Sequence, residues 1–137
     1  MMSVNAFKGV EVGAGFASSA VFGSELHDEI LFEDDKITRS RNNAGGIEGG
    51  MSNAQPIHVK VSMKPISTLI KPLRSIDLNT MEPKLAHKER TDSCAVPAAS
   101  IIGESMLAIV LADALLEKFG GDSIKQLKKH IKSSGKY

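Results

Sequence analysis

The side chains best suited to chemistry lie at residues 90–94, which read Arg-Thr-Asp-Ser-Cys. Arg90 and Asp92 are two residues apart, so on an extended segment their side chains share one face. An arginine and a carboxylate placed in this way could bind an anion and move a proton. The alternative is an isolated surface ion pair, which contributes little to stability. Cys94 is more often a small buried hydrophobic residue than a nucleophile.

A Gly-rich segment, residues 39–55, is the second candidate. Its four glycines are free to take positive φ angles: Gly45, Gly46, Gly49 and Gly50. Their backbone N–H groups could converge on an anion, and Arg39 and Arg41 stand just upstream. However, the segment lacks the Lys-Ser/Thr ending of a phosphate-binding Walker loop, and no helix is predicted after it. A flexible surface loop is the alternative.

The third candidate, residues 64–68, reads Lys-Pro-Ile-Ser-Thr and follows the clearest strand pattern in the chain. Strand ends are common places for ligand contacts. A lysine and two hydroxyls there could hold a phosphate or the edge of a flavin. Considered by itself, the segment fits an ordinary turn with a solvated lysine better.

Composition and charge argue against several classes of function. The four histidines show no metal-ligand spacing and no Cys-x-x-Cys motif occurs, so we expect no metal. A net charge of +1 argues against a dedicated nucleic-acid-binding protein. The longest apolar stretch, residues 106–116, contains Asp113 and is too short to span a bilayer, so we expect a soluble protein with no membrane role. A single cysteine fits a reducing cytoplasm.

The elements that must position these groups are predicted to be strands first and helices last, which makes the class α+β. The predicted strands lie at residues 4–12, 30–32, 37–38, 57–63 and 73–78. The second and third form a hairpin closed by an acidic turn. The fourth alternates apolar and polar residues, as a strand with one buried face does. Residues 39–55 and 79–91 are predicted to be loops.

Residues 98–119 read as one long helix that is apolar on more than one face, and such a helix is usually buried. Two carboxylates inside it, Glu104 and Asp113, would then need partners elsewhere. Two glycines stop this helix, and Asp122 or Ser123 caps a second one with a solvated lysine face. The predicted layout is strands and the Gly-rich loop over residues 1–97, helices over residues 98–132 and a flexible tail over residues 133–137.

Four segments of the chain resemble one protein family, in the right order and over nearly the whole length. They are residues 5–13 (NAFKGVEVG), residues 43–53 (NAGGIEGGMSN), the segment opened by Lys64-Pro65, and residues 90–97 (RTDSCAVP) followed by Glu104. Each is similar to a segment of chorismate synthase. The resemblance implies that the chain is the C-terminal portion of such an enzyme. It would form part of a β-α-β sandwich, with antiparallel strands followed by the long buried helix.

The resemblance also implies a reaction, a cofactor and partners. The family converts 5-enolpyruvylshikimate 3-phosphate to chorismate and phosphate by an anti-1,4-elimination, in the shikimate pathway to aromatic amino acids. It needs reduced FMN, which is thought to lend an electron transiently, and NADPH only where the enzyme reduces its own flavin. Its members are typically homotetramers, which implies a homo-oligomer here. The expected compartment is the cytoplasm, or a plastid if the source is a plant or related eukaryote.

Two sets of residues take their roles from the matching motifs. FMN contacts would fall on Asn5, Ala6, Gly49, Lys64, Pro65, Ile66, Ser67, Thr68 and Arg90. Arg90 would also lie near the anionic groups of the substrate, which suits the fixed fork of a guanidinium. Asp92 would handle the proton through the flavin N5.

The chain also departs from the family pattern. Ile66 stands where a hydroxyl residue is often found, and Thr91 where many members have Ser or His. The two catalytic histidines, the Arg-Pro-Gly-His-Ala-Asp segment and the serine/arginine segment of the family's N-terminal half are missing. We therefore expect the isolated chain to be inactive. The alternatives are a non-catalytic structural or oligomerisation fragment with at most a partial FMN or phosphate site, and an unrelated anion-binding module.

Overall fold

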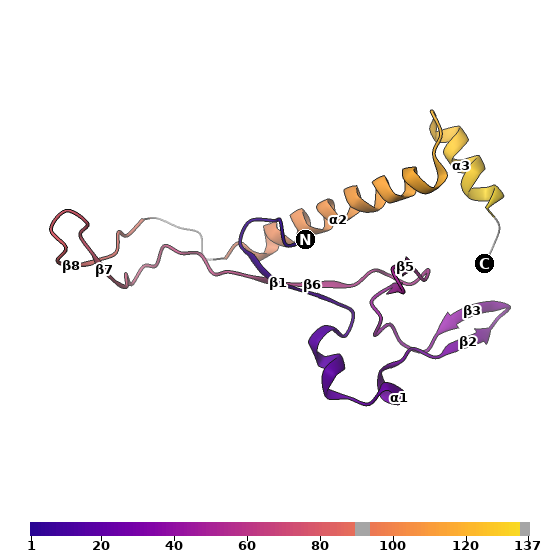
Figure 1. Cartoon of the computed structure of the whole chain (residues 1–137), viewed down its shortest axis with the longest axis horizontal. Helices are drawn as coiled ribbons and strands as arrows, with labels where there is room; N and C mark the ends of the chain where they lie inside the picture. Colours follow the sequence, from indigo (N-terminus) through magenta and orange to yellow (C-terminus); the bar gives the residue numbers. More distant parts are fainter. Residues whose placement is uncertain (90–93, 135–137) are drawn as a thin grey trace. The chain divides into compact units, whose positions relative to one another are not determined.

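The computed structural model describes residues 1–89 and 94–134. The chain divides into two compact units, one formed by Met2–Lys64 and the other by Pro65–Tyr137 together with Met1. Small antiparallel sheets come before a long helix along the chain (Figure 1), which confirms the predicted α+β class.

An antiparallel pair of strands joins the two ends of the first unit. β1 (Phe7–Val12) pairs with β6 (Val59–Met63), with Val10 opposite Val61. The side chains of β6 alternate between half-buried and exposed, as the predicted period of two requires. Phe7, at the start of β1, is the most buried apolar side chain described, at 3% exposed. Both predicted strands are confirmed, and each begins slightly later than the sequence predicts.

The predicted hairpin is also confirmed. β2 (Ile30–Glu33) and β3 (Lys36–Arg39) pair antiparallel, with Phe32 opposite Ile37. The two turn residues, Asp34 and Asp35, have φ angles of 51° and 57°. A two-residue turn between twisted strands needs these left-handed angles, and aspartate tolerates them better than most residues do.

Short elements form in segments that the sequence predicts to be turns or loop. They are the 3-10 helix η1 (Gly15–Ala20), the helical turn α1 (Gly23–Leu26), and the strands β4 (Ile47–Glu48) and β5 (Met51–Ser52). Gly49 and Gly50 form the turn between β4 and β5, with φ angles of 58° and 78°. Gly45 and Gly46 also have positive φ angles. The predicted conformation of all four glycines is therefore confirmed, although the segment contains a small hairpin.

Gly13 and Gly45 let three backbone segments meet without side chains between them. The Gly13 N–H donates to the His58 carbonyl at 2.9 Å, and the His58 N–H donates to the Gly45 carbonyl at 3.1 Å. A Cβ atom on Gly13, whose φ is 58°, would overlap the carbonyl oxygen of Asn43 and the amide nitrogen of Gly45. Both conformation and space therefore require glycine at this position.

The second unit begins with another hairpin. β7 (Arg74–Ile76) and β8 (Pro83–Leu85) pair antiparallel. β7 lies within its predicted strand. The prediction of a loop over residues 79–91 is wrong where β8 forms, because the pairing with β7 defines β8 and its own apolar pattern does not.

An ion pair lies beside the turn of this hairpin. Lys84 Nζ lies 3.0 Å from Asp77 Oδ2. The hydrogen bond from Lys84, followed by that from the backbone of Asn79, holds the pKa of Asp77 below its ordinary value. The pair therefore supports the hairpin above the ordinary carboxyl pKa, and this support is lost as the pH falls through the lowered value.

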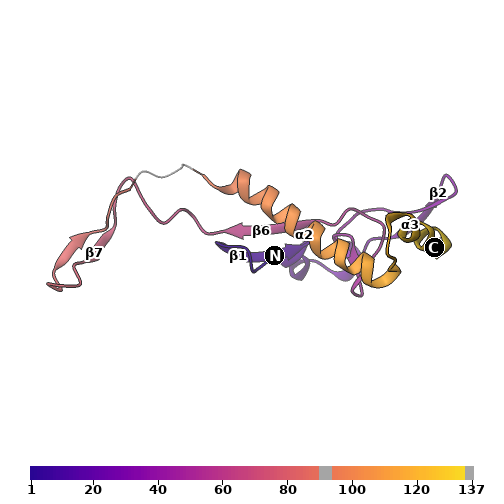
Figure 2. The same cartoon turned by 90° about the horizontal axis from the view of Figure 1, so that it is seen from above.

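Two helices end the described part of the chain. They are α2 (Val96–Phe119) and α3 (Ile124–Ser133), joined by a short turn (Figure 2). Gly120, with φ of 60°, ends α2, and its N–H donates back into the last helical turn. Ser123 caps α3 by accepting a hydrogen bond from the Gln126 N–H at 3.2 Å. The predicted stop and cap are both confirmed.

The prediction that the long helix is buried is wrong. Only Ala99 and Gly103 of α2 are buried, and Ile109 is 62% exposed. Glu104 and Asp113, which we expected to be buried carboxylates, are exposed as well. A helix that is apolar on all sides needs neighbours on all sides, and the residues that the structure describes do not supply them.

The same helix also bears on the prediction about membranes. The stretch 106–116 is too short to cross a bilayer, but α2 as a whole is long and apolar enough by length and composition. The core helix of a soluble protein passes the same test, so the observation is weak evidence for a membrane span.

We predict that Gly13→Ala lowers the free energy of unfolding by about 2–4 kcal/mol, because the left-handed strain adds to a backbone overlap. Gly49→Ala is the matched control, since Gly49 has the same φ of 58° and nothing within 4 Å of its added Cβ. It should cost only about 1–2 kcal/mol, the strain alone. Urea unfolding followed by circular dichroism measures both, and equal losses would contradict the overlap.

Candidate functional site

Three of the predicted FMN contacts meet at one end of the β1–β6 pair. The Lys64 N–H donates to the Ala6 carbonyl at 2.7 Å, which continues the pairing one step beyond β6. Ala6 has a φ of 68°, which turns the chain into β1 directly after Asn5. The side chains of Asn5 and Lys64 are exposed. The structure therefore gathers an amide and an ammonium group at this strand end.

The next four predicted contacts follow directly along the chain. β6 ends at Met63, so residues 64–68 do begin at a strand end, as predicted. The segment Pro65 to Thr68 belongs to the second unit and forms neither helix nor strand. Pro65 and Ser67 are exposed, whereas Ile66 and Thr68 are half-buried.

Gly49 is not brought beside Ala6 and Lys64. The Gly-rich segment is attached to the first residues of β6, through the hydrogen bond between His58 and Gly45. Ala6 and Lys64 lie at the last residues of the same strand, and Figure 1 shows the β4–β5 turn beyond the opposite end. Within the first unit, the predicted FMN contacts thus form two separate groups.

The predicted catalytic pair, Arg90 and Asp92, lies outside the described residues. Cys94, just after it, is exposed. The expectation of a buried cysteine is therefore wrong. Cys94 is exposed because it lies next to the start of α2, which is itself exposed.

The Gly-rich segment uses its N–H groups internally. The Gly45 N–H donates to the Asn42 carbonyl at 3.1 Å, and the Gly46 N–H donates to Asn42 Oδ1 at 2.9 Å. Both glycines are buried. Since these donors already have partners within the chain, they do not converge on a bound anion, and this part of the segment is not a flexible surface loop either.

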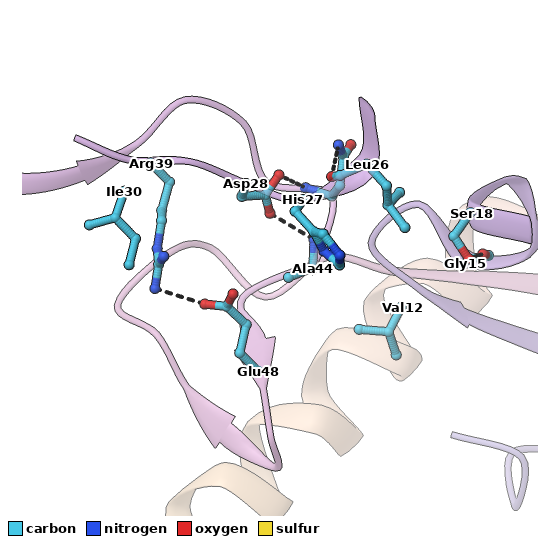
Figure 3. A pocket seen from close by; sticks show the side chains of 11 residues that line it. Val12, Gly15, Ser18, Leu26, His27, Asp28, Ile30, Arg39, Ala44 and Glu48 are labelled. Carbon is cyan, nitrogen blue, oxygen red and sulfur yellow. Dashed lines mark hydrogen bonds and ion pairs between the residues drawn. The ribbon is translucent and has the colours of Figure 1, made fainter. Parts of the chain in front are cut away.

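A pocket that the sequence patterns did not predict lies beside this segment (Figure 3). Its volume is about 470 Å³, and it lies entirely within the first unit. It is lined by Val12, Gly15, Ser18, Leu26, His27, Asp28, Ile30, Arg39, Asn43, Ala44 and Glu48. None of the predicted FMN or catalytic residues is among them.

The carboxylate of Asp28 forms two hydrogen bonds with the backbone of residues that line the pocket. Its Oδ1 accepts a hydrogen bond from the Asn43 N–H and its Oδ2 one from the Ala44 N–H, both at 2.9 Å. The side-chain amide of Asn43 in turn donates to the Leu26 carbonyl at 2.7 Å. The sequence signal that could have indicated this contact is weak, because aspartate and asparagine bond to loop backbone in many arrangements.

An ion pair joins two other residues that line the pocket. Arg39 Nη2 lies 2.8 Å from Glu48 Oε2, and the Arg39 side chain is only 17% exposed. Asn53 donates to the same Glu48 oxygen at 2.8 Å. Arg39 was a candidate for binding an anion, but its guanidinium is engaged by a carboxylate of its own chain. The charged groups of the pocket therefore hold the loop in place.

The sequence of the chain matches one protein family. The family model described as Chorismate synthase matches residues 1–116. The chain is similar to the chorismate synthase of Aquifex aeolicus, with 57% identity over 97% of this chain and 35% of that protein. It is also similar to that of Geotalea uraniireducens, with 52% identity over 97% of this chain and 36% of that protein.

A solved structure gives the same result. A crystal structure of chorismate synthase matches with a TM-score of 0.75 and 46% identity, over 97% of this chain and 33% of that one. The chain therefore spans about a third of the length of the curated relatives that it matches. The family match includes Asn5, Ala6 and Lys64, the neighbouring strands β1 and β6, and most of α2.

We predict that Asp28→Asn lowers the free energy of unfolding by about 1–3 kcal/mol, because an amide cannot accept both backbone hydrogen bonds through two oxygens. Glu29→Gln makes the same change of charge at the next residue, whose side chain is exposed. It should change stability by less than about 0.5 kcal/mol. Thermal unfolding measures both variants, and similar losses would show that net charge matters and the Asp28 contacts do not.

Proposed function

Because the chain belongs to the chorismate synthase family, we propose that it is part of a phosphate-lyase that forms chorismate from 5-enolpyruvylshikimate 3-phosphate. The observation that carries this proposal is the family match over residues 1–116. The reaction is an anti-1,4-elimination in the shikimate pathway. Because the chain spans about a third of its relatives, the remainder of the fold has to complete the site.

The donor groups at the end of the β1–β6 pair fit one part of reduced FMN. An exposed ammonium on Lys64 and an exposed carboxamide on Asn5 suit the phosphate of the cofactor. The hydroxyls of Ser67 and Thr68 follow along the chain. Reduced FMN, when bound, supplies a transient electron that helps phosphate to leave. The 470 Å³ pocket is lined by none of these residues, so it is not assigned to the flavin ring.

The remaining roles extend the proposal to other residues. Gly49 and the segment from Pro65 to Ile66 would approach the cofactor through backbone, since neither proline nor isoleucine offers a polar side chain. Arg90 would bind the anionic groups of the substrate, and the carboxylate of Asp92 would hold and move the proton. We also propose a cytoplasmic or plastid homotetramer, with NADPH required only if the enzyme reduces its own flavin.

A second candidate function is a structural or oligomerisation fragment with at most a partial FMN or phosphate site. It is supported by the missing histidine and arginine segments of the family and by the coverage of only a third of the relatives. The two proposals differ in whether the chain binds the cofactor, so they are separated by a binding measurement.

We predict that the chain by itself forms no detectable chorismate with reduced FMN, and that it quenches the fluorescence of FMN weakly. Lys64→Ala should weaken that binding about tenfold (~1.4 kcal/mol), because it removes a charged donor to phosphate. Lys71→Ala removes another exposed lysine nearby in sequence and is the control. Equal binding by both variants would remove Lys64 from the site, and chorismate production by the chain would contradict the first prediction.

A second prediction concerns Asp92. In a full-length family member, replacing the aspartate equivalent to Asp92 by asparagine should cut turnover by about 10²-fold or more, because the general acid–base group is lost. FMN affinity should stay nearly unchanged. Turnover is measured by chorismate formation and affinity by flavin fluorescence. An unaffected rate would remove Asp92 from the mechanism.

A further inference from the structure

The last helix, α3, carries its lysines on one side. At about 100° per residue, they fall within an arc of about 100° around the helix axis. They are Lys125, Lys128, Lys129 and Lys132, and all four are exposed. The helix contains no aspartate or glutamate, and within the described part of the chain no ion pair joins these lysines to a carboxylate. This lysine face therefore presents four positive charges to solvent.

The contacts that hold α3 to the rest of the chain lie on the side opposite the lysine face. Leu127 is buried, at 8% exposed. His130 Nδ1 lies 2.7 Å from the carbonyl oxygen of Phe119, the last residue of α2. Around the helix axis, Leu127 and His130 are centred about 180° from the middle of the lysine face. The lysines therefore point away from the chain to which they belong.

The lysine face is long and convex, which suits an extended array of negative charges better than a single small anion. Lys125 and Lys132 are seven residues apart, or about 10 Å along the axis. An ammonium group binds phosphate as a point charge, without the fixed geometry of a guanidinium. Four such groups along two helical turns therefore match a surface on which phosphates repeat.

Anionic bilayers and nucleic acids both present repeated phosphates, and the surroundings of the lysine face favour the bilayer. Ile124 and Ile131 lie beside Lys128 on one edge of the face, and they are 67% and 38% exposed. A helix in a bilayer interface places such apolar side chains at the boundary between headgroups and acyl chains. Single-stranded nucleic acids are held by aromatic stacking, and α3 has no Phe, Tyr or Trp. The net charge of +1 also argues against nucleic acid.

We propose that the lysine face of α3, with Ile124 and Ile131 at its edge, docks on bilayers that contain anionic phospholipids. α3 lies parallel to the bilayer surface, with its ammonium groups among the lipid phosphates. The contact is peripheral and requires no segment that crosses the bilayer. It differs from the expectation of no membrane role, which rests on the length needed for a spanning segment. The family model ends at residue 116, before α3, so the proposal does not depend on the proposed function.

The test is flotation of the full 137-residue chain with vesicles, because flotation separates bound chain from aggregates. One set of vesicles is pure phosphatidylcholine, and the other is an equimolar mixture of phosphatidylcholine and phosphatidylglycerol. α2 exposes apolar side chains to both sets, so binding through α2 does not distinguish them. We expect binding to the anionic set to be tighter by at least about tenfold. This preference should disappear at about 1 M salt, where the Debye length falls to about 3 Å.

Two double variants locate the binding surface. Lys128→Gln together with Lys132→Gln should weaken binding to the anionic vesicles about 25-fold, roughly fivefold for each lysine. Glutamine is about as good a helix former as lysine, so the helical content in circular dichroism should not change. Lys36→Gln together with Lys71→Gln is the matched control, because it removes the same charge from exposed positions in other segments. It should weaken binding by less than about twofold.

Several outcomes would overturn the proposal. Equal binding to the two sets of vesicles would do so, as would no binding to the anionic set. Equal losses in the two double variants would show that net charge determines binding and the lysine face does not. The chain is also titrated with a labelled DNA duplex at the same salt concentration. Tighter binding to the duplex than to the anionic vesicles, lost in the variant of α3, would assign the lysine face to nucleic acid instead.

Discussion

The antiparallel pairing of β1 with β6 is the interaction on which the first unit depends. It joins segments that are far apart in sequence and fixes what lies at either end of the pair. At one end, the backbone bond from Lys64 to Ala6 brings Asn5 and Lys64 to the same strand end. At the other end, Gly13, His58 and Gly45 tie the Gly-rich segment to the strands. A substitution that disturbs this pairing therefore reaches both the candidate site and the loop.

The two ends of the pair differ in how they use their polar groups. At the Gly-rich end, Asp28 accepts from two backbone N–H groups and Arg39 is paired with Glu48, so charge serves to order the loop. At the other end, Asn5 and Lys64 direct polar side chains to solvent. Satisfied groups stabilise a fold, whereas exposed donors can meet a ligand. This difference, and not the size of the pocket, supports the proposal that places the cofactor contacts at the second end.

The sequence predicts those structural features that are determined by residues close to one another along the chain. The alternation in β6, the acidic turn at Asp34 and Asp35, the stop at Gly120 and the cap at Ser123 each follow from local chemistry, and each is confirmed. The strand β8 and the contacts of Asp28 depend on partners distant in sequence, so no local pattern indicates them. Of the candidate site, only the strand end at Lys64 could be predicted from periodicity. The roles of Asn5 and Ala6 came from the family resemblance.

The wrong prediction about α2 follows from the same distinction. The composition of α2 indicates that the helix requires an apolar environment on all sides. It does not indicate which segments of the family fold provide that environment. Burial depends on the whole packed fold, and the chain spans about a third of the length of the curated relatives that it matches. The exposure of Ile109 and Leu111 is therefore consistent with a sequence shaped by contacts to the rest of the fold.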